Sequence, residues 1–181
     1  MTGVDGRMVV LTGPPGAGKS TVAAILAESY SPSVHLHADD FWHFLRRGAI
    51  PPYRAEAHEQ NRVVVTALAR AAATYAAGGY SVIVDGVIGP WFIETFCAEA
   101  NLAVDYLVLR PDEETTVRRA LARGDDALTD PVPIGSMYAQ FADLGAYERN
   151  VIDTTADTPD ITAERIRTAL SSRDYQIGPE S

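Results

Sequence analysis

Cysteine is almost absent from this sequence, since Cys97 is the only one among its 181 residues. A single thiol excludes an intramolecular disulfide and is compatible with a reducing compartment. Long apolar runs are absent too, because no segment approaches the ~20 apolar residues of a membrane span and the first residues lack a signal-peptide pattern. The sequence therefore predicts a cytoplasmic protein without a membrane partner.

Positive charge is scarce as well. The chain has 15 Lys and Arg residues against 24 Asp and Glu residues, which gives a formal net charge of −9. Binding of nucleic acid depends on neutralising phosphates with cations, so an acidic surface works against that class of partner. We therefore expect no nucleic-acid partner, and an anionic ligand has to be held by local groups.

Repeats, low-complexity tracts and interdomain linkers are also missing from the sequence. Hydrophobic residues make up 46% and charged residues 22%, a balance that predicts an ordinary globular protein. This length is sufficient to bury a substantial core within one unit. We predict a single domain over residues 1–181.

Short apolar runs alternate along the chain with longer segments of helical periodicity. Strands are predicted at 8–11, 34–38, 81–84, 105–109 and 151–153. Helices are predicted at 20–30, 41–47, 55–77, 90–100, 112–123 and 159–170. This alternation predicts parallel strands joined by right-handed crossovers, and hence a three-layer α/β domain. Ligands of such sheets bind at the carboxyl ends of the strands, which singles out the motifs below, Arg110, and Thr154 with Thr155.

A glycine-rich motif follows the first predicted strand. It reads Gly13-Pro14-Pro15-Gly16-Ala17-Gly18-Lys19-Ser20 and fits the phosphate-loop pattern G-x-x-x-x-G-K-[ST] at every fixed position. Its glycines allow the backbone N–H groups to wrap around phosphates. The next helix begins at this loop, and its N-terminus is a site for anions, so Thr21 is included in the predicted nucleotide site. Lys19 is predicted to bind the β- and γ-phosphates of ATP, and Ser20 to place its hydroxyl on Mg²⁺.

Two adjacent carboxylates, Asp39 and Asp40, close the second predicted strand. Phosphoryl transfer to an alcohol needs a carboxylate that accepts the hydroxyl proton and an acidic group near Mg²⁺. Neighbouring strand residues point to opposite sides, so the two aspartates can divide these tasks. We predict Asp40 as the base and Asp39 near the metal. The alternative is a solvated turn or a helix N-cap.

A third carboxylate, Asp85, ends the third predicted strand. An apolar strand that ends in Asp is typical of a carboxylate reaching the Mg²⁺ shell, so Asp85 joins Ser20 and Asp39 as a predicted metal residue. The alternative is a turn residue before Gly86. His35 and His37 share one face of the second strand and are interpreted as buried, hydrogen-bonded histidines, with a metal pair as the alternative.

Arginines gather at the end of the helix predicted at 112–123. Arg119 and Arg123 are four residues apart and share a helix face, so they are predicted to act on the transferred phosphoryl group. Arg118 is predicted to contact the nucleotide, and the loop 124–133 to form a closing lid. The alternative is a favourable interaction of positive charge with the helix C-terminus.

A basic pair, Arg46 and Arg47, follows the aromatic residues Phe41, Trp42 and Phe44. An acceptor pocket lined by aromatic and basic groups suits an amphipathic or anionic small molecule. The alternative is an aromatic stripe that faces the core on a short helix.

Taken together, these motifs resemble the small P-loop kinases. The resemblance rests on the phosphate loop, on Asp39-Asp40, on Val84-Asp85-Gly86, on the RRALARG segment and on Val151-Ile152-Asp153-Thr154. That group includes shikimate kinase, gluconate kinase, chloramphenicol phosphotransferase and zeta-toxin-like kinases. The chain departs from shikimate kinase because it lacks the glycine triplet after the third strand, and it lacks the acceptor motif of gluconate kinase.

The resemblance implies a P-loop NTPase fold with a five-stranded parallel sheet in the order 2-3-1-4-5. It also implies an acceptor region at about 39–60 and a lid at about 118–135, and an aspartate after the second strand that activates the acceptor hydroxyl. Asp40 or Asp39 matches that residue. The implied reaction is transfer of the γ-phosphate of ATP to a hydroxyl of a small molecule.

Two rival functions stay open at this point. One is a nucleotide-dependent switch or regulatory ATPase without a small acceptor, and the other is a structural domain with a vestigial loop, against which the intact Lys19 and Ser20 argue. No motif chooses between ATP and GTP, and the chain is expected to be a monomer or a homodimer.

Overall fold

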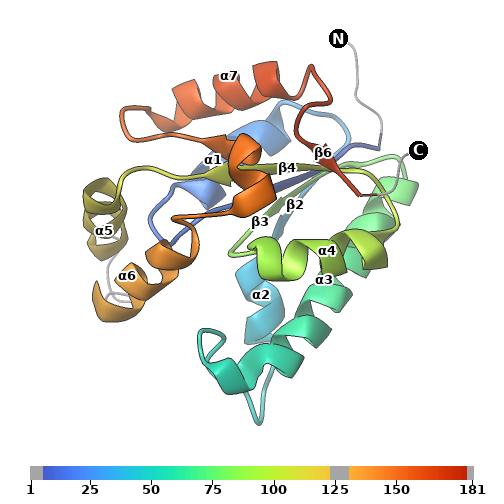
Figure 1. The fold of residues 1–181 in the computed structure, drawn as a ribbon. Coiled ribbons are helices and arrows are strands. Elements are labelled where there is room, and N and C mark those ends of the chain that lie inside the picture. The colour runs from blue at the N-terminus through green and yellow to red at the C-terminus, as the bar shows by residue number, and fades with distance from the viewer. Residues whose placement is uncertain (1–5, 123–130, 179–181) are drawn as a thin grey trace.

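One parallel sheet forms the centre of the protein (Figure 1). The computed structural model describes residues 6–122 and 131–178. Within them, five strands follow the order β2-β3-β1-β4-β5, and a sixth, β6, pairs with β4. Their bounds are β1 Met8–Thr12, β2 Ser33–His37, β3 Ser81–Asp85, β4 Val104–Leu109, β5 Val151–Ile152 and β6 Gln176–Ile177. The predicted order and the predicted α/β class are both confirmed.

The central strands are the most apolar, because sheets covered on both faces bury every residue of an inner strand. All residues of β1, β3 and β4 are buried, whereas β2 at the edge is half-buried throughout. Val10 of β1 aligns with Val84 on one side and Tyr106 on the other, in parallel register. This register brings the carboxyl ends of β1 and β3 together at one edge of the sheet.

Helices cover both faces of the sheet, as three layers require. The longer ones are α1 Lys19–Glu28, α3 His58–Ala77, α4 Pro90–Ala100 and α7 Pro159–Ala169. Val9 and Leu11 of β1 pack with the cluster that holds α1 and α7, while Val10 packs with α3 and α4 on the opposite face. The alternation of side chains along one strand therefore supplies two cores.

Shorter elements connect these layers. They are α2 Ala38–His43, η1 Ala55–Ala57, α5 Glu113–Leu121, α6 Pro131–Gln140 and η2 Gly145–Asn150. The predicted helix at 112–123 is confirmed as α5, which Asp112 caps by accepting a hydrogen bond from the Thr115 N–H at 2.7 Å. No helix in 6–122 or 131–178 is long and apolar enough to cross a bilayer.

The strand predicted at 34–38 is wrong at its end, and this changes the setting of two aspartates. The strand β2 ends at His37, and α2 begins at Ala38 without a connecting loop. Asp39 and Asp40 therefore lie in the first turn of α2, where carboxylates interact favourably with the helix dipole. Their division of labour cannot rest on strand alternation, since consecutive helical residues are separated by about 100°.

One predicted strand, β5, and one strand that was not predicted, β6, pair with the same side of β4. The strand β5 pairs in parallel with Val108 and Leu109, and β6 pairs antiparallel with Val104 and Asp105. The buried Asn150 lies between the two pieces, donating from Nδ2 to the carbonyls of Tyr106 at 2.9 Å and Tyr175 at 3.3 Å. Two short segments thus pair with the two ends of one edge of β4.

Candidate functional site

The loop between β1 and α1 has a backbone that glycine alone fits at two positions. Gly13 has φ 142, and a Cβ atom there would lie 2.1 Å from the Leu109 carbonyl oxygen. Gly16 has φ 87, and a Cβ atom there would lie 2.3 Å from the Thr116 carbonyl oxygen on α5. The glycines of the motif therefore allow the loop to lie directly against β4 and α5.

The ammonium group of Lys19 lies over this loop. Lys19 Nζ donates to the carbonyl oxygens of Gly13 and Pro14, both at 3.0 Å. Its side chain is buried, and Lys19 is the only lysine in the chain. The first N–H groups of α1 have no partners within the helix, and they adjoin this loop because α1 begins at Lys19. A cation and a set of N–H donors are thus gathered in one concave loop, which suits an anion.

A hydrogen-bonded cluster joins the start of α1 to the end of β3. Ser20 Oγ donates to Asp85 Oδ2 at 2.6 Å. The other oxygen, Oδ1, accepts from His35 Nε2 at 2.7 Å and from His37 Nδ1 at 3.0 Å. Asp85 is fully buried, so these donors replace the water that an ionised carboxylate otherwise requires.

The cluster keeps Asp85 ionised. Burial by itself raises the pKa of Asp85, but the hydrogen bonds from His35, Ser20 and His37 outweigh it and lower the pKa to about 2. Burial lowers the pKa of His37, yet its hydrogen bond to Asp85 and the neighbouring carboxylates leave that pKa above its usual value. The predicted hydrogen bonding of both histidines is confirmed, but the predicted burial is wrong, because both side chains are half-buried on the edge strand β2.

The two predicted acceptor-side carboxylates lie next to this cluster but differ in their contacts. Asp39 is exposed, and its Oδ2 lies 3.8 Å from His37 Nε2, so His37 stands between Asp39 and Asp85. Asp40 is also exposed, and within the described part of the chain it has no side-chain hydrogen bond or ion pair. The assignment of base and metal residue to this pair stays a prediction.

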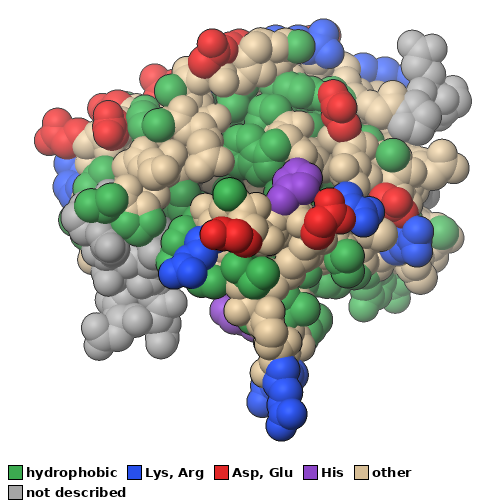
Figure 2. Space-filling view, turned by 60° about the horizontal axis from the view of Figure 1, so that its bottom comes forward, with side chains coloured by type: hydrophobic (Ala, Val, Ile, Leu, Met, Phe, Trp, Pro, Cys, Tyr) green, Lys and Arg blue, Asp and Glu red, His purple; other side chains and the backbone are tan. Residues whose placement is uncertain are grey.

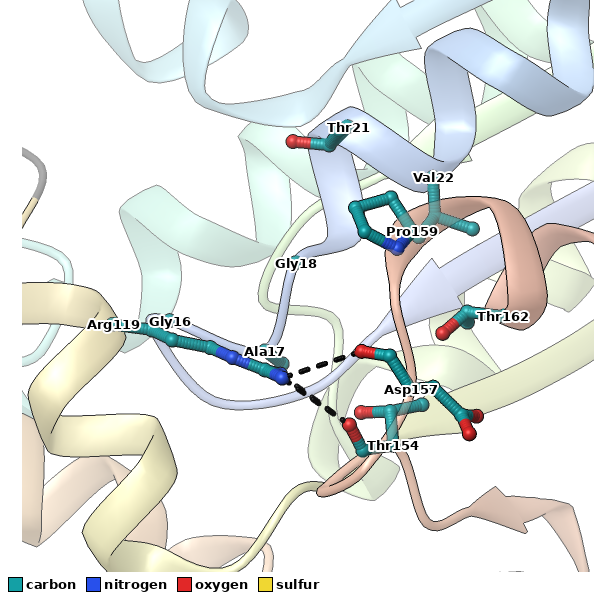
Figure 3. Close-up of a pocket in the computed structure, with 10 residues that line it drawn as sticks. All are labelled: Gly16, Ala17, Gly18, Thr21, Val22, Arg119, Thr154, Asp157, Pro159 and Thr162. Atoms are coloured by element: carbon teal, nitrogen blue, oxygen red, sulfur yellow. Dashed lines mark hydrogen bonds between the residues drawn. The ribbon is translucent and has the colours of Figure 1, made fainter.

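A pocket of about 210 Å³ opens beside the phosphate loop (Figure 3). One wall comes from the loop and α1, another from Arg119 of α5, and a third from the segment after β5 together with the start of α7. Its lining residues are Gly16, Ala17, Gly18, Thr21, Val22, Arg119, Thr154, Asp157, Pro159 and Thr162. Sequence reasoning had singled out Thr154 as a residue after a strand, but it had no signal for Asp157, Pro159 or Thr162.

The guanidinium of Arg119 extends across this pocket. It donates long hydrogen bonds of 3.4 Å to the carbonyl oxygens of Thr154, Thr155 and Asp157, two of which Figure 3 shows. These partners are neutral carbonyls and the bonds are long, so Arg119 keeps its charge available to an anionic ligand.

The other predicted arginines have different settings. Arg118 is exposed, donates to Thr115 Oγ1 at 3.5 Å and lines a separate hollow on the outside of α5. It is not among the residues that line the phosphate-loop pocket. Arg123 and residues 124–130 of the predicted lid lie outside the described residues. Arg110 donates to the Phe141 carbonyl at 2.8 Å and pairs with Glu148 at 2.9 Å, so it anchors the segment after α6.

The sequence matches a known family over nearly all of this architecture. A model of the chloramphenicol phosphotransferase-like protein family matches residues 6–171. The chain belongs to that family. The resemblance to the small P-loop kinases, which the motifs indicated, is therefore confirmed. A comparison with curated protein sequences gives no significant match.

Solved structures share the fold of this family member at low sequence identity. A sugar kinase from Janibacter sp. has a TM-score of 0.68 and 23% identity, with 91% of this chain and 94% of that chain covered. The Deinococcus radiodurans tunicamycin resistance protein has a TM-score of 0.70 and 16% identity, covering 96% and 99%. A gluconokinase from Sinorhizobium meliloti has a TM-score of 0.62 and 15% identity, covering 91% and 95%.

Proposed function

We propose that the protein is a kinase that transfers the γ-phosphate of ATP, bound with Mg²⁺, to a hydroxyl group of a small molecule. The observation that carries this proposal is the link from Ser20 to the buried, ionised Asp85 at the base of a glycine-rich loop that also holds Lys19. Membership of a phosphotransferase-like family supports it.

The nucleotide would lie along the loop with its base end in the pocket beside Arg119. Backbone N–H groups at the start of α1 and the Lys19 ammonium would bind the β- and γ-phosphates. The pocket of about 210 Å³ between Arg119 and Pro159 would then hold the nucleoside. In this arrangement the phosphates extend from the pocket along the loop to Ser20, which is hydrogen-bonded to Asp85.

The oxygen donors present fit Mg²⁺. This ion prefers hard oxygen ligands, and it takes several of them from water and phosphate, so the protein needs to supply only one or two. Ser20 donates a hydrogen bond to Asp85, which leaves the lone pairs of Ser20 Oγ as donors to the ion. Bound there, the ion would neutralise charge that develops on the transferred group.

The transfer step needs a base on the acceptor side. The acceptor oxygen forms a bond to the γ-phosphorus as the bond from that phosphorus to the β,γ-bridging oxygen breaks, which yields ADP and a phosphate ester. The hydroxyl proton passes to a carboxylate, for which we propose Asp40. Asp39 lies closer to the cluster around Asp85, through His37, and is proposed to act on the metal side.

The experiment that tests this function is ADP release measured with Mg·ATP alone and with a panel of metabolite and antibiotic hydroxyl compounds. We expect turnover to depend on an acceptor. Turnover that responds to a protein partner and to no small molecule would support the switch instead. The same samples, analysed by gel filtration, would check the expected monomer or homodimer, and added oligonucleotide would check the expected lack of nucleic-acid binding.

A further inference from the structure

The segment between α2 and η1, residues 44–54, is fixed to α3 although most of it is exposed. Gln60 of α3 forms two hydrogen bonds with one residue of the segment. Its Oε1 accepts from the Ile50 N–H at 2.8 Å, and its Nε2 donates to the Ile50 carbonyl at 2.7 Å. The Gln60 amide thus pairs with both backbone groups of Ile50, as a residue of a neighbouring strand would.

The next residue, Asn61, extends this attachment to α2. Asn61 Nδ2 donates to the Pro52 carbonyl at 2.7 Å, and its Oδ1 accepts from Trp42 Nε1 at 2.8 Å. Asn61 is only 5% exposed, so these bonds are shielded from water. An exposed loop held by three side-chain hydrogen bonds has lost much of its conformational freedom, and a ligand that binds it need not order it.

The fixed segment carries charge of the sign that the rest of the chain lacks. It contains Arg46, Arg47 and Arg54 and no Asp or Glu, so its formal charge is +3 in a chain of −9. All three arginines are exposed, and none has a carboxylate within ion-pair distance among the residues that the structure describes. Figure 2 shows basic side chains at the end of the projection that this segment forms.

Two exposed aromatic side chains accompany the arginines. Phe44 is 69% exposed and Tyr53 is 53% exposed, although both are large apolar groups. The ring centres of Phe44 and Phe41 lie 5.6 Å apart, and Phe41 directly follows Asp40 in α2. Unpaired guanidinium groups beside exposed rings can hold an anionic group and cover an apolar or planar portion of one ligand.

We infer that residues 44–54 form the acceptor platform, and that the acceptor is an elongated hydroxyl compound with a phosphate, sulfate or carboxylate group at the end far from the reacting hydroxyl. This inference rests on the proposed kinase function and adds the class of its acceptor. The helix α2 advances by about 1.5 Å per residue, so Asp40, the proposed base, lies roughly 6 Å along the helix axis from the start of the platform at Phe44. The anionic group and the hydroxyl must be separated by a similar length.

The test measures binding apart from transfer. The protein is saturated with Mg²⁺ and a non-hydrolysable ATP analogue, which keeps anions off the phosphate loop. Thermal shift and calorimetry then compare matched probes, glucose with gluconate and ribose with ribose 5-phosphate, together with a short single-stranded oligonucleotide. The variant is R46Q/R47Q, and the matched control R149Q/R173Q removes the same charge from two exposed arginines elsewhere on the chain.

We expect at least one anionic probe to bind more tightly than its neutral counterpart. We expect R46Q/R47Q to weaken that binding about tenfold or more, since charge-assisted hydrogen bonds are lost, and added salt to weaken it too. The control should bind as the wild type does. Equal binding of charged and neutral probes, equal losses in both variants, or a preference for the oligonucleotide would each overturn the inference. A probe that binds at the platform but is never phosphorylated would count against the kinase function alone.

Discussion

His35 Nε2 donates a hydrogen bond of 2.7 Å to Asp85 Oδ1, and this bond joins the edge strand β2 to the carboxylate that holds Ser20. His37 donates to the same oxygen at 3.0 Å from Nδ1, whereas His35 uses Nε2. The orientation of Asp85, and with it the orientation of the Ser20 hydroxyl, is therefore set by donors on a neighbouring strand.

Amide substitutions can test this relationship because the two histidines use different ring nitrogens. The amide nitrogen of Gln extends about as far as Nε2, and that of Asn about as far as Nδ1. We expect His35→Gln and His37→Asn to keep most of the stability and the Mg²⁺ dependence of nucleotide binding. His35→Asn and His37→Gln should lose about 1–3 kcal/mol, the range for an unmade hydrogen bond to a buried group.

Urea unfolding and calorimetric titration of nucleotide at several Mg²⁺ concentrations would measure both effects. At each histidine, the Asn and Gln variants serve as controls for each other, since the two amides differ only in length. If all four variants behave alike, the donors do not position Asp85.

Acid stability should depend on Asp85. Its pKa of about 2 lies below the ordinary 3.8, so its ionisation stabilises the folded protein above pH 3.8, and that contribution is lost as the pH falls through about 2. The shift corresponds to roughly 2 kcal/mol. Urea unfolding between about pH 5 and pH 2 should therefore show a shallower loss of stability in Asp85→Asn than in the wild type. Parallel curves would contradict the assignment of this pKa.

Lys19→Ala should weaken nucleotide binding by ~10²-fold or more, because charge-assisted hydrogen bonds to phosphate oxygens are lost. Fluorescence titration with a labelled ATP analogue would measure this, and far-UV circular dichroism would establish that the variant is folded. Since Lys19 is the only lysine, an amine-directed reagent can modify only it and the N-terminus, and nucleotide should protect it. Unchanged affinity in a folded variant would refute the phosphate-loop assignment.

Asp39 and Asp40 should have separable roles. Asn has nearly the shape of Asp but cannot accept a proton or carry the charge. Asp40→Asn should keep Mg·ATP binding and lose transfer by ~10²–10⁴-fold, whereas Asp39→Asn should raise the Mg²⁺ concentration needed for activity. Transfer rates against Mg²⁺ concentration distinguish the two. A normal rate in Asp40→Asn with a dead Asp39→Asn at every Mg²⁺ concentration would reverse the assignments.

Arg119 can act on the nucleoside or on the transferred phosphate, and kinetics separate the two. Its position across the pocket leads us to expect that Arg119→Ala raises the KM for ATP by about tenfold, with a smaller change in kcat. Arg118→Ala is the matched control, since its exposed side chain lies outside that pocket. A loss confined to kcat would support the action on the transition state that the sequence predicted.

Parts of the fold could be predicted because residues at the ends of an element indicate where it begins and ends. The helix α4 has its predicted bounds, since Pro90 fixes its first turn and Asn101, with φ 52, ends it. The helix α6 was not predicted, and its first three residues were assigned to the loop 124–133. Its sequence PVPIGSMYAQ contains residues that disfavour helices, and burial of Ile134 accompanies the helical structure. The strand β6 has two residues, too few for any periodicity to show.

The same limit applies to the candidate site. The phosphate loop and Asp85 have local signatures in the sequence. The loop could be predicted because its motif fits the phosphate-loop pattern at every fixed position. The bonds from His35 and His37 to Asp85 span 50 and 48 residues, so only the pairing of β2 with β3 brings these groups together. The pocket wall formed by Asp157 and Pro159 likewise depends on how α7 packs against α1.

The pairing of β5 and β6 with β4 affects whether copies of this chain associate with each other. An open strand edge presents unpaired N–H and C=O groups that a second molecule can extend into an intermolecular sheet. Here Val104 and Asp105 are shielded by Gln176 and Ile177, which are among the last described residues. A chain shortened before Tyr175 would uncover that stretch of β4, and its first symptom should be self-association, measurable by light scattering, rather than a loss of nucleotide binding.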